Sequence, residues 1–294
     1  MKEKLILTFY AQTPVHMGSG TSVSYVDNPV QREKHTDFPI LAGSGIKGVI
    51  RALAERVWSD KGKVDVIFGP EKEAEEYASC ISLTDAKILF YPVRSVKGVF
   101  AYITCPYVLK RFKNELKSIE KDNLPEIPEI NDDNKILVCE KPELKINNNK
   151  VALEEFVFDV DSQNIDGLAD KLSEFLPDEI KGDFFKKHFA IVSDNVFRDF
   201  TKYAVEIRTR IRIDQTTGTV SEGALFTIEL VPAESVFYGF LFITDPYKKD
   251  IKDIQEIKCA QKVQNEMKNL LNGNIIQLGG DETLGMGLMK VKAS

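Results

Sequence analysis

The sequence has few of the residues that usually hold metal ions or form disulfides. Its 294 residues include four cysteines and three histidines. Neither set follows the close spacing of a zinc site, and there is no HExxH motif. The cysteines are too scattered for a disulfide framework, so we expect incidental or structural thiols.

Long apolar runs are also missing. No stretch approaches the length of a membrane span, and the apolar part of residues 1–12 is too short and too often interrupted for a signal peptide. The sequence contains no GxxxxGK[ST] phosphate-binding loop either. We therefore expect a cytoplasmic protein without a membrane partner, and a first strand at about 4–10.

The excess of positive charge that marks many nucleic-acid-binding domains is absent. Lys and Arg number 39 and Asp and Glu 45, which gives a net charge of −6. This balance argues against a protein that binds nucleic acid by bulk attraction. It leaves room for a local basic groove, because residues 202–212 carry a single acid, Glu206, among the cations Lys202, Arg208, Arg210 and Arg212.

The sequence does have a globular composition, with 43% hydrophobic and 29% charged residues. Strand and helix patterns alternate too irregularly for a doubly wound parallel sheet, and favour an α+β fold with a ferredoxin-like (RRM-like) core enlarged by insertions. Residues 119–150, rich in Asn, Asp, Lys, Glu and Pro, are predicted to form a polar surface insertion with at most a short strand at 136–139. Other predicted elements are strands at 81–91 and 99–104, and helices at 44–58, 71–77, 106–117 and 248–271.

A long β-hairpin is predicted at about 205–228. Apolar residues alternate with charged ones up to residue 213, residues 214–218 supply the turn, and strand residues resume toward Leu230. A strand whose second face is largely Arg should face solvent or a polyanion. The pattern alone does not choose between the two.

A helix is predicted to begin at Gly43-Ser44-Gly45, with Ser44 as its N-cap. Its buried face would consist of Ile46, Ile50, Leu53 and Val57. Lys47 and Arg51 lie four apart on another stripe. A phosphate bound at the helix start, where free N–H groups favour an anion, would explain both cations, and two solvated surface residues are the alternative.

Near the C-terminus, glycines cluster at Gly279, Gly280, Gly285 and Gly287. Glycines this dense let the backbone approach a ligand or another chain closely, and free N–H groups can cradle phosphate. Tight turns are the alternative.

Three segments together resemble the RAMP superfamily of CRISPR-associated RNA-binding proteins: TPVHMGSG, GSGIKGVIRALAE and LGGDETLGMGLMKV. The blocks YVDNPVQREKHTDFPILAGSGIKG, SLTDAKILFYPVRSVKGVFAYIT and IRIDQTTGTVSEGALF are similar to the Cas7-group backbone subunit of the type III-B (Cmr) effector complex. The match runs over nearly the whole chain, which implies a single domain over residues 1–294.

This resemblance implies a function. Several copies would assemble with other Cmr subunits as a helical filament along one crRNA. The hairpin of each copy would protrude as a thumb and interrupt pairing between the guide and a complementary single-stranded target RNA. At each interruption a loop acid would promote cleavage of the target, with a divalent metal, Mg²⁺, as cofactor.

The resemblance also implies catalytic residues. The family's key acid lies in a D-x-P-x-Q-R-E segment, which places it at Asp27, and the loop His of its TP-x-H segment falls on His16. Glu229 stands where members of the family carry further acidic or aromatic residues after the hairpin. From the residues alone, Asp27 could equally start a turn and His16 could be structural. A lone Asp, with a pKa of about 3.9, is a weak base, so we favour metal positioning for Asp27.

The RNA-binding residues that the resemblance implies are Ser44, Gly45, Lys47, Arg51, Arg32, His35, Gly279 and Gly280. The first four would bind guide phosphates at the helix start. Other functions stay open: a non-catalytic crRNA-binding scaffold, a crRNA-processing endoribonuclease that relies on its loop His, and a small-molecule enzyme that uses Asp27 and His35.

Overall fold

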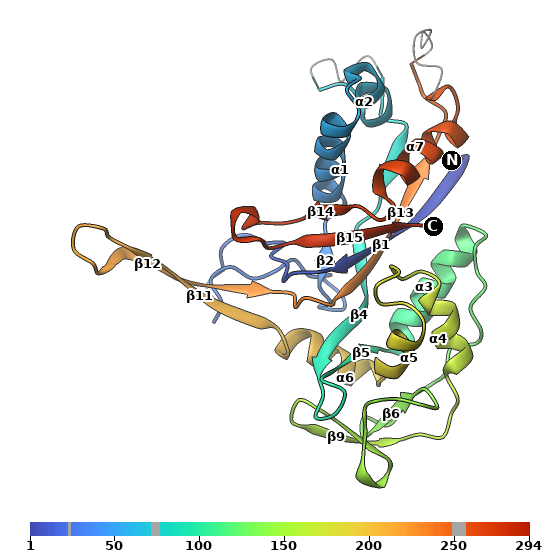
Figure 1. Ribbon diagram of the computed structural model, residues 1–294, viewed down its shortest axis with the longest axis vertical. Helices are drawn as coiled ribbons and strands as arrows, with labels where there is room; N and C mark the ends of the chain where they lie inside the picture. The colour runs from blue at the N-terminus through green and yellow to red at the C-terminus, as the bar shows by residue number, and fades with distance from the viewer. Residues whose placement is uncertain (23–24, 72–76, 249–256) are drawn as a thin grey trace.

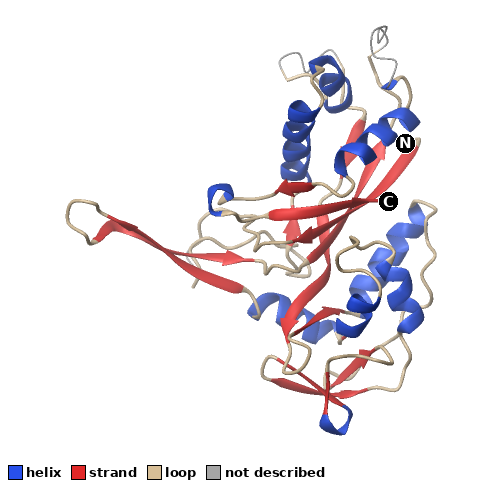
Figure 2. Cartoon of the chain, in the orientation of Figure 1, coloured by secondary structure: helices blue, strands red, loops and turns tan. Residues whose placement is uncertain are grey.

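The computed structural model describes the chain except for residues 23–24, 72–76 and 249–256 (Figure 1). The molecule is elongated, and a long hairpin projects from the middle of one side (Figure 2). In the described part of the chain, none of the helices combines the length and the apolarity that a membrane span requires.

The centre of the fold is an antiparallel sheet. Its strands lie in the order β15 (Leu288–Ala293), β1 (Glu3–Ala11), β13 (Val236–Ile243) and β4 (Ala86–Arg94). Helix α1 (Gly43–Val57) connects the β1 and β4 regions of the chain, and α7 (Ala260–Leu271) connects β13 with the C-terminal strands. This connectivity is consistent with the predicted ferredoxin-like core, and the α+β class is confirmed.

Further strands and helices extend this core. Beyond β4 the sheet continues through β5, β10, β6, β9, β8 and β7, while β14 pairs with β15, β2 with β4 and β3 with β13. The bounds are β2 Ile40–Leu41, β3 Ile81–Leu83, β5 Phe100–Thr104, β6 Lys135–Val138, β7 Lys145–Ile146, β8 Lys150–Leu153, β9 Phe156–Val160, β10 Phe189–Ile191 and β14 Ile275–Gln277. The helices are α2 Lys61–Phe68, α3 Pro106–Ser118, α4 Asp166–Ser173, α5 Asp183–His188 and α6 Asp194–Tyr203, with 3₁₀ turns at Asn147–Asn149 and Glu282–Leu284.

Several predicted elements are confirmed. The first strand, the strand at 99–104 and the helix at 106–117 correspond to β1, β5 and α3. The strand predicted at 81–91 is interrupted at residues 84–85, which separate β3 from β4. The helix predicted at 71–77 falls largely outside the described residues, as does the first part of the one predicted at 248–271, whose described part is α7.

The start of α1 corrects the predicted N-cap. Ser44 is exposed and caps nothing, because the helix already begins at Gly43. The Gly43 N–H donates to the Asp85 carboxylate at 2.7 Å. A side chain at residue 43 would lie only 2.8 Å from the Thr84 carbonyl oxygen, so glycine lets the β3–β4 loop come close enough to cap the helix.

The buried face of α1 differs from the prediction at its end. Ile46 and Ile50 are fully buried as expected, and Leu53 is half-buried. Val57 is 57% exposed, because the helix ends there and Ala54 is the last residue to face the sheet.

Residues 119–150 contribute more to the interior than their composition suggests. The short strand expected near 136–139 exists as β6, and β7 follows it. Apolar residues spaced between the polar ones are buried, namely Ile119, Leu124, Ile127, Ile130 and Leu144. Sequence composition does not reveal these buried positions, because each of the five stands alone between polar or proline residues that are more exposed.

The hairpin consists of β11 (Glu206–Ile213) and β12 (Val220–Leu230). The Asp214 carboxylate accepts hydrogen bonds from the backbone N–H groups of Thr216 and Thr217 and so closes the turn. Figure 1 shows the hairpin projecting well away from the body. Its root, which we define as residues 206–210 and 226–230, contacts other segments through Arg210, Thr227 and Ile228.

Candidate functional site

Three segments that are far apart in the sequence meet at the hairpin root. They are the loop after β1 (residues 12–31), strand β12 and the glycine loop (residues 278–287), as Figure 1 shows. Backbone hydrogen bonds join them: the Val15 N–H donates to the Val231 carbonyl at 2.9 Å, and the Gly280 N–H donates to the His16 carbonyl at 2.9 Å. The candidate acid and histidine therefore lie against the root of the hairpin.

Asp27 is exposed and is held by Thr227 of β12. The Thr227 N–H donates to Asp27 Oδ2 at 2.7 Å, and the Thr227 hydroxyl donates to the same oxygen at 2.9 Å. The Asp27 N–H in turn donates to Thr227 Oγ1 at 3.0 Å. Within the described residues, nothing donates to Oδ1. Among the described contacts, Thr227 therefore fixes the carboxylate through Oδ2.

These hydrogen bonds hold the pKa of Asp27 below its usual value, because the backbone N–H and the hydroxyl of Thr227 stabilise the charged form. A carboxylate that stays ionised is a poor proton acceptor and a good ligand for a hard divalent cation. The environment of Asp27 therefore favours metal positioning over general-base action.

His16 belongs to the same loop as Asp27, and its ring makes contacts within the protein. Its Nδ1 lies 2.8 Å from the carbonyl oxygen of Glu229, which requires that this nitrogen carry the proton. Its Nε2 would be 2.8 Å from a side chain at residue 18, so Gly18 makes room for the ring. The ring thus joins the loop after β1 to β12.

The glycine loop packs closely against the His16 segment. Gly279 has φ +85°, and a side chain there would lie 2.3 Å from the His16 carbonyl oxygen. The N–H groups of Gly280, Gly285 and Gly287 donate to carbonyl oxygens of the protein. The close backbone approach predicted from the glycines is present, but these three donors are not free for RNA.

Arg32 and Glu229 form a buried ion pair at 2.6 Å, with side chains 14% and 6% exposed. Arg32 also donates to the carbonyl oxygens of Asp37 and Thr201, and Glu229 accepts from the Val30 N–H. The Arg32 side chain is therefore used for contacts within the protein and is not exposed as an RNA contact would be. Glu229 likewise holds the 27–33 segment on β12 and lacks a free carboxylate oxygen for catalysis.

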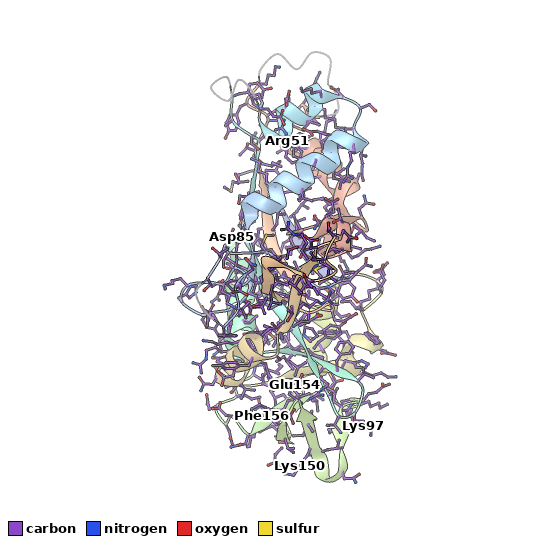
Figure 3. All side chains as sticks on the ribbon, turned by 90° about the vertical axis from the view of Figure 1, so that its left-hand side faces the viewer. Arg51, Asp85, Lys97, Lys150, Glu154 and Phe156 are labelled. Carbon is purple, nitrogen blue, oxygen red and sulfur yellow. The ribbon has the colours of Figure 1, made fainter. Side chains whose placement is uncertain are left out.

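The two cations of α1 have different surroundings. Arg51 is tied to the end of α2: it contacts Asp65 at 2.8 Å and the Gly69 carbonyl at 2.6 Å, in addition to Glu55 at 3.0 Å. It lies well along α1 from Asp85, which marks the helix start (Figure 3). The Arg51 guanidinium is therefore bound within the protein. This does not support the prediction that Lys47 and Arg51 bind one phosphate together.

Lys47 remains available. In the described part of the chain, no hydrogen bond or ion pair engages its ammonium group, and partial burial together with the nearby Arg51 lowers its pKa. Partial burial of a cation is costly, and a bound anion would lower that cost. Ser44 and Gly45 are exposed in the same first turn, and Met17 of the loop after β1 lies beside Gly45.

His35 lies in an exposed turn, and its side chain makes no hydrogen bond or ion pair with the residues that the structure describes.

Two features of the site were missed by sequence reasoning. One is Thr227 as the partner of Asp27. The other is the ion pair of Arg210 with Asp281, at 2.9 Å, which ties the hairpin to the glycine loop. Neither has a local signal, because each joins residues far apart in the sequence.

The Arg face of β11 is also less open than predicted. Arg208 pairs with Glu206 and Arg210 with Asp281, and both side chains are partly covered. The apolar face is the more exposed one, with Ile207 at 47% and Ile211 at 53%. Arg212, beyond the root, is exposed.

The fold and the site agree with a known family. The chain belongs to the RAMP superfamily, whose family description matches residues 8–290. The CRISPR system Cmr endoribonuclease Cmr4 of Pyrococcus furiosus is 40% identical over 294 residues, covering 97% of this chain and 94% of the relative. The CRISPR system CMR subunit Cmr4 of Saccharolobus solfataricus is 24% identical and covers 98% of each chain.

A solved structure shows the same similarity. The crystal structure of oligomeric Cmr4 from Pyrococcus furiosus matches with a TM-score of 0.77 and 32% sequence identity, covering 99% of this chain and 97% of that one. The resemblance to the type III-B (Cmr) backbone subunit that the motifs predicted is confirmed.

Proposed function

We propose that this chain is the crRNA-binding backbone subunit of a type III-B CRISPR ribonucleoprotein and an endoribonuclease that cleaves complementary target RNA, with Asp27 as its key acid. The observation that carries the proposal is the exposed Asp27 carboxylate at the root of a protruding hairpin, held there by Thr227 through Oδ2. A 40% identical relative is named as an endoribonuclease of the same system, which supports the activity.

The RNA contacts follow from what the protein leaves open. Lys47, with Ser44 and Gly45 in the same exposed first turn, provides a cation and backbone N–H groups for a guide phosphate. Arg212 on the hairpin is a second cation without a described partner. These local cations explain how a chain of net charge −6 binds RNA. His35 is exposed and is a further candidate RNA contact. Gly279 and Gly280 would act indirectly, through their close packing against His16.

The partners are crRNA, complementary target RNA, further copies of this chain in a helical filament and the other Cmr subunits. The oligomeric crystal form of the 32% identical Cmr4 supports self-assembly. We propose the cytoplasm as the location, where such RNAs are found.

RNA carries its own nucleophile, the 2′-hydroxyl, so the protein needs to align it with the phosphate and to stabilise developing charge. The hairpin would distort the target strand beside Asp27 and supply that alignment. Asp27 Oδ1 would hold a divalent cation, Mg²⁺, which when bound neutralises the phosphate charge.

The residues present fit such a cation. The described residues contain no cluster of three or more His, Cys, Asp or Glu side chains that could enclose a metal. Mg²⁺ does not require one, because it commonly keeps several waters and takes one or two carboxylates together with substrate phosphates. A single anchored carboxylate facing RNA meets that requirement.

Asp27→Asn in the reconstituted complex tests this proposal. Asparagine preserves the shape but not the charge, so we expect target cleavage to fall by about 100-fold or more while crRNA and target binding persist. Asp178→Asn, at an exposed acid away from the hairpin root, is the matched control and should cleave normally.

Three results would contradict the assignment in different ways. Normal cleavage by D27N with bound crRNA would leave the chain as a scaffold or move the activity to another residue. Metal-independent cleavage of repeat RNA by the isolated chain would instead indicate a crRNA-processing enzyme. A purified complex without RNA would reopen the small-molecule alternative.

A further inference from the structure

We propose that Thr227 is a positioning residue for target cleavage: its side chain fixes one oxygen of the Asp27 carboxylate so that the other faces the RNA. The inference rests on the proposed role of Asp27. It assigns a function to a threonine of the hairpin that no sequence motif singled out.

The hydrogen-bond geometry carries the argument. The Thr227 hydroxyl has one proton, which it donates to Asp27 Oδ2 at 2.9 Å, and its oxygen accepts from the Asp27 N–H at 3.0 Å. The hydroxyl therefore joins the main chain and the side chain of Asp27. Together with the Thr227 N–H, at 2.7 Å from Oδ2, it gives the carboxylate two hydrogen bonds at the same oxygen.

The main chain next to Asp27 also makes two hydrogen bonds to β12 that do not involve this hydroxyl. The Asn28 N–H donates to the Thr227 carbonyl at 3.0 Å, and the Glu229 N–H donates to the Asn28 carbonyl at 3.0 Å. Removal of the hydroxyl should therefore loosen the carboxylate without releasing the loop from β12. This separation makes the role testable, because a purely structural threonine would affect the loop as a whole.

The position also links the acid to the hairpin. Thr227 stands at the root, two residues from Glu229, whose buried carboxylate fixes β12 against the body. Whatever distortion the hairpin imposes on bound RNA, the carboxylate keeps a constant position relative to the hairpin. Strand β12 would thus align the acid with the base step that the hairpin displaces.

Three variants in the reconstituted complex test the inference. Thr227→Val keeps the shape and the N–H but removes the hydroxyl, and Thr227→Ser restores it. Thr209→Val is the matched control, because Thr209 pairs directly with Thr227 across the hairpin and makes no hydrogen bond through its side chain to the described residues. Single-turnover cleavage, target affinity and the Mg²⁺ concentration for half-maximal rate would be measured, along with guide retention.

We expect T227V to cleave about 10-fold more slowly or worse and to need more Mg²⁺, since small displacements of a catalytic group cost that much. Target affinity and guide retention should match the wild type, T227S should recover most of the rate, and T209V should be normal. Wild-type cleavage by T227V, or T227S as slow as T227V, would overturn the inference. D27N is assayed in parallel: its normal cleavage would overturn the proposed function itself, whereas inactive D27N with fully active T227V would overturn only the role of Thr227.

Discussion

At the scale of single residues, two carboxylates close together on the hairpin root have opposite roles because of their surroundings. Asp27 is exposed and accepts its described side-chain hydrogen bonds through Oδ2, whereas Glu229 is buried and shares both of its oxygens with the protein. Sequence reasoning found Asp27 through a family motif. It could not foresee that Glu229 is sequestered, because its partner Arg32 lies 197 residues away.

The buried pair predicts a clear stability effect. Glu229→Ala leaves the Arg32 guanidinium buried without its countercharge, which should cost about 3–5 kcal/mol in the free energy of unfolding. Urea unfolding of the isolated chain measures this. A double variant, Arg32→Met with Glu229→Met, removes both charges and should recover much of the loss.

The exposed acid provides the contrast. D27A should unfold close to the wild type and yet fail to support target cleavage, whereas E229A should be unstable. If E229A proved as stable as the wild type, the structural role of the pair would be refuted.

At the scale of elements, the hairpin could be predicted from its alternation and from its turn, which begins with Asp214 and ends with Gly218, since both are local signals. Its attachment could not be. The Arg residues that seemed to offer an open basic face are partly used within the protein, as in the pair of Arg210 with Asp281. The start of α1 shows the same limit, because its cap comes from Asp85 of a distant loop and not from Ser44.

The glycine loop allows a matched test of close approach. Gly279 and Gly285 both have positive φ, +85° and +72°, but only Gly279 has a neighbour that a side chain would strike, the His16 carbonyl 2.3 Å away. Gly285→Ala should cost about 1 kcal/mol of stability through backbone strain alone. Gly279→Ala should cost about 3 kcal/mol or more, because the loop must also move.

Cleavage should follow the same order, with G279A impaired through the displaced His16 loop and G285A nearly normal. Thermal unfolding and target cleavage of the two variants check this. Equal effects of the two substitutions would show that the loop does not support the site through its contact with His16.

At the scale of the whole molecule, the α+β class and the family were within reach of the sequence, because motifs and strand patterns extend over most of the chain. Residues 119–150 were harder, since outside the run at 136–139 their buried side chains stand singly among polar ones. Both chain termini contribute to one sheet, with β15 beside β1, so the loop after β1 and the glycine loop are brought together at the hairpin root. The site therefore forms only when the N-terminal and C-terminal strands pair in the folded chain.

The most direct test of the account is a structure of the assembled complex with crRNA, Mg²⁺ and a target RNA that carries a 2′-deoxy nucleotide at the cleavage position. The account predicts that Asp27 Oδ1 lies opposite the phosphate next to that nucleotide, within the span of one hydrated metal ion, while Oδ2 stays bound to Thr227. A target phosphate aligned with another acid, with Asp27 turned away from the RNA, would contradict it.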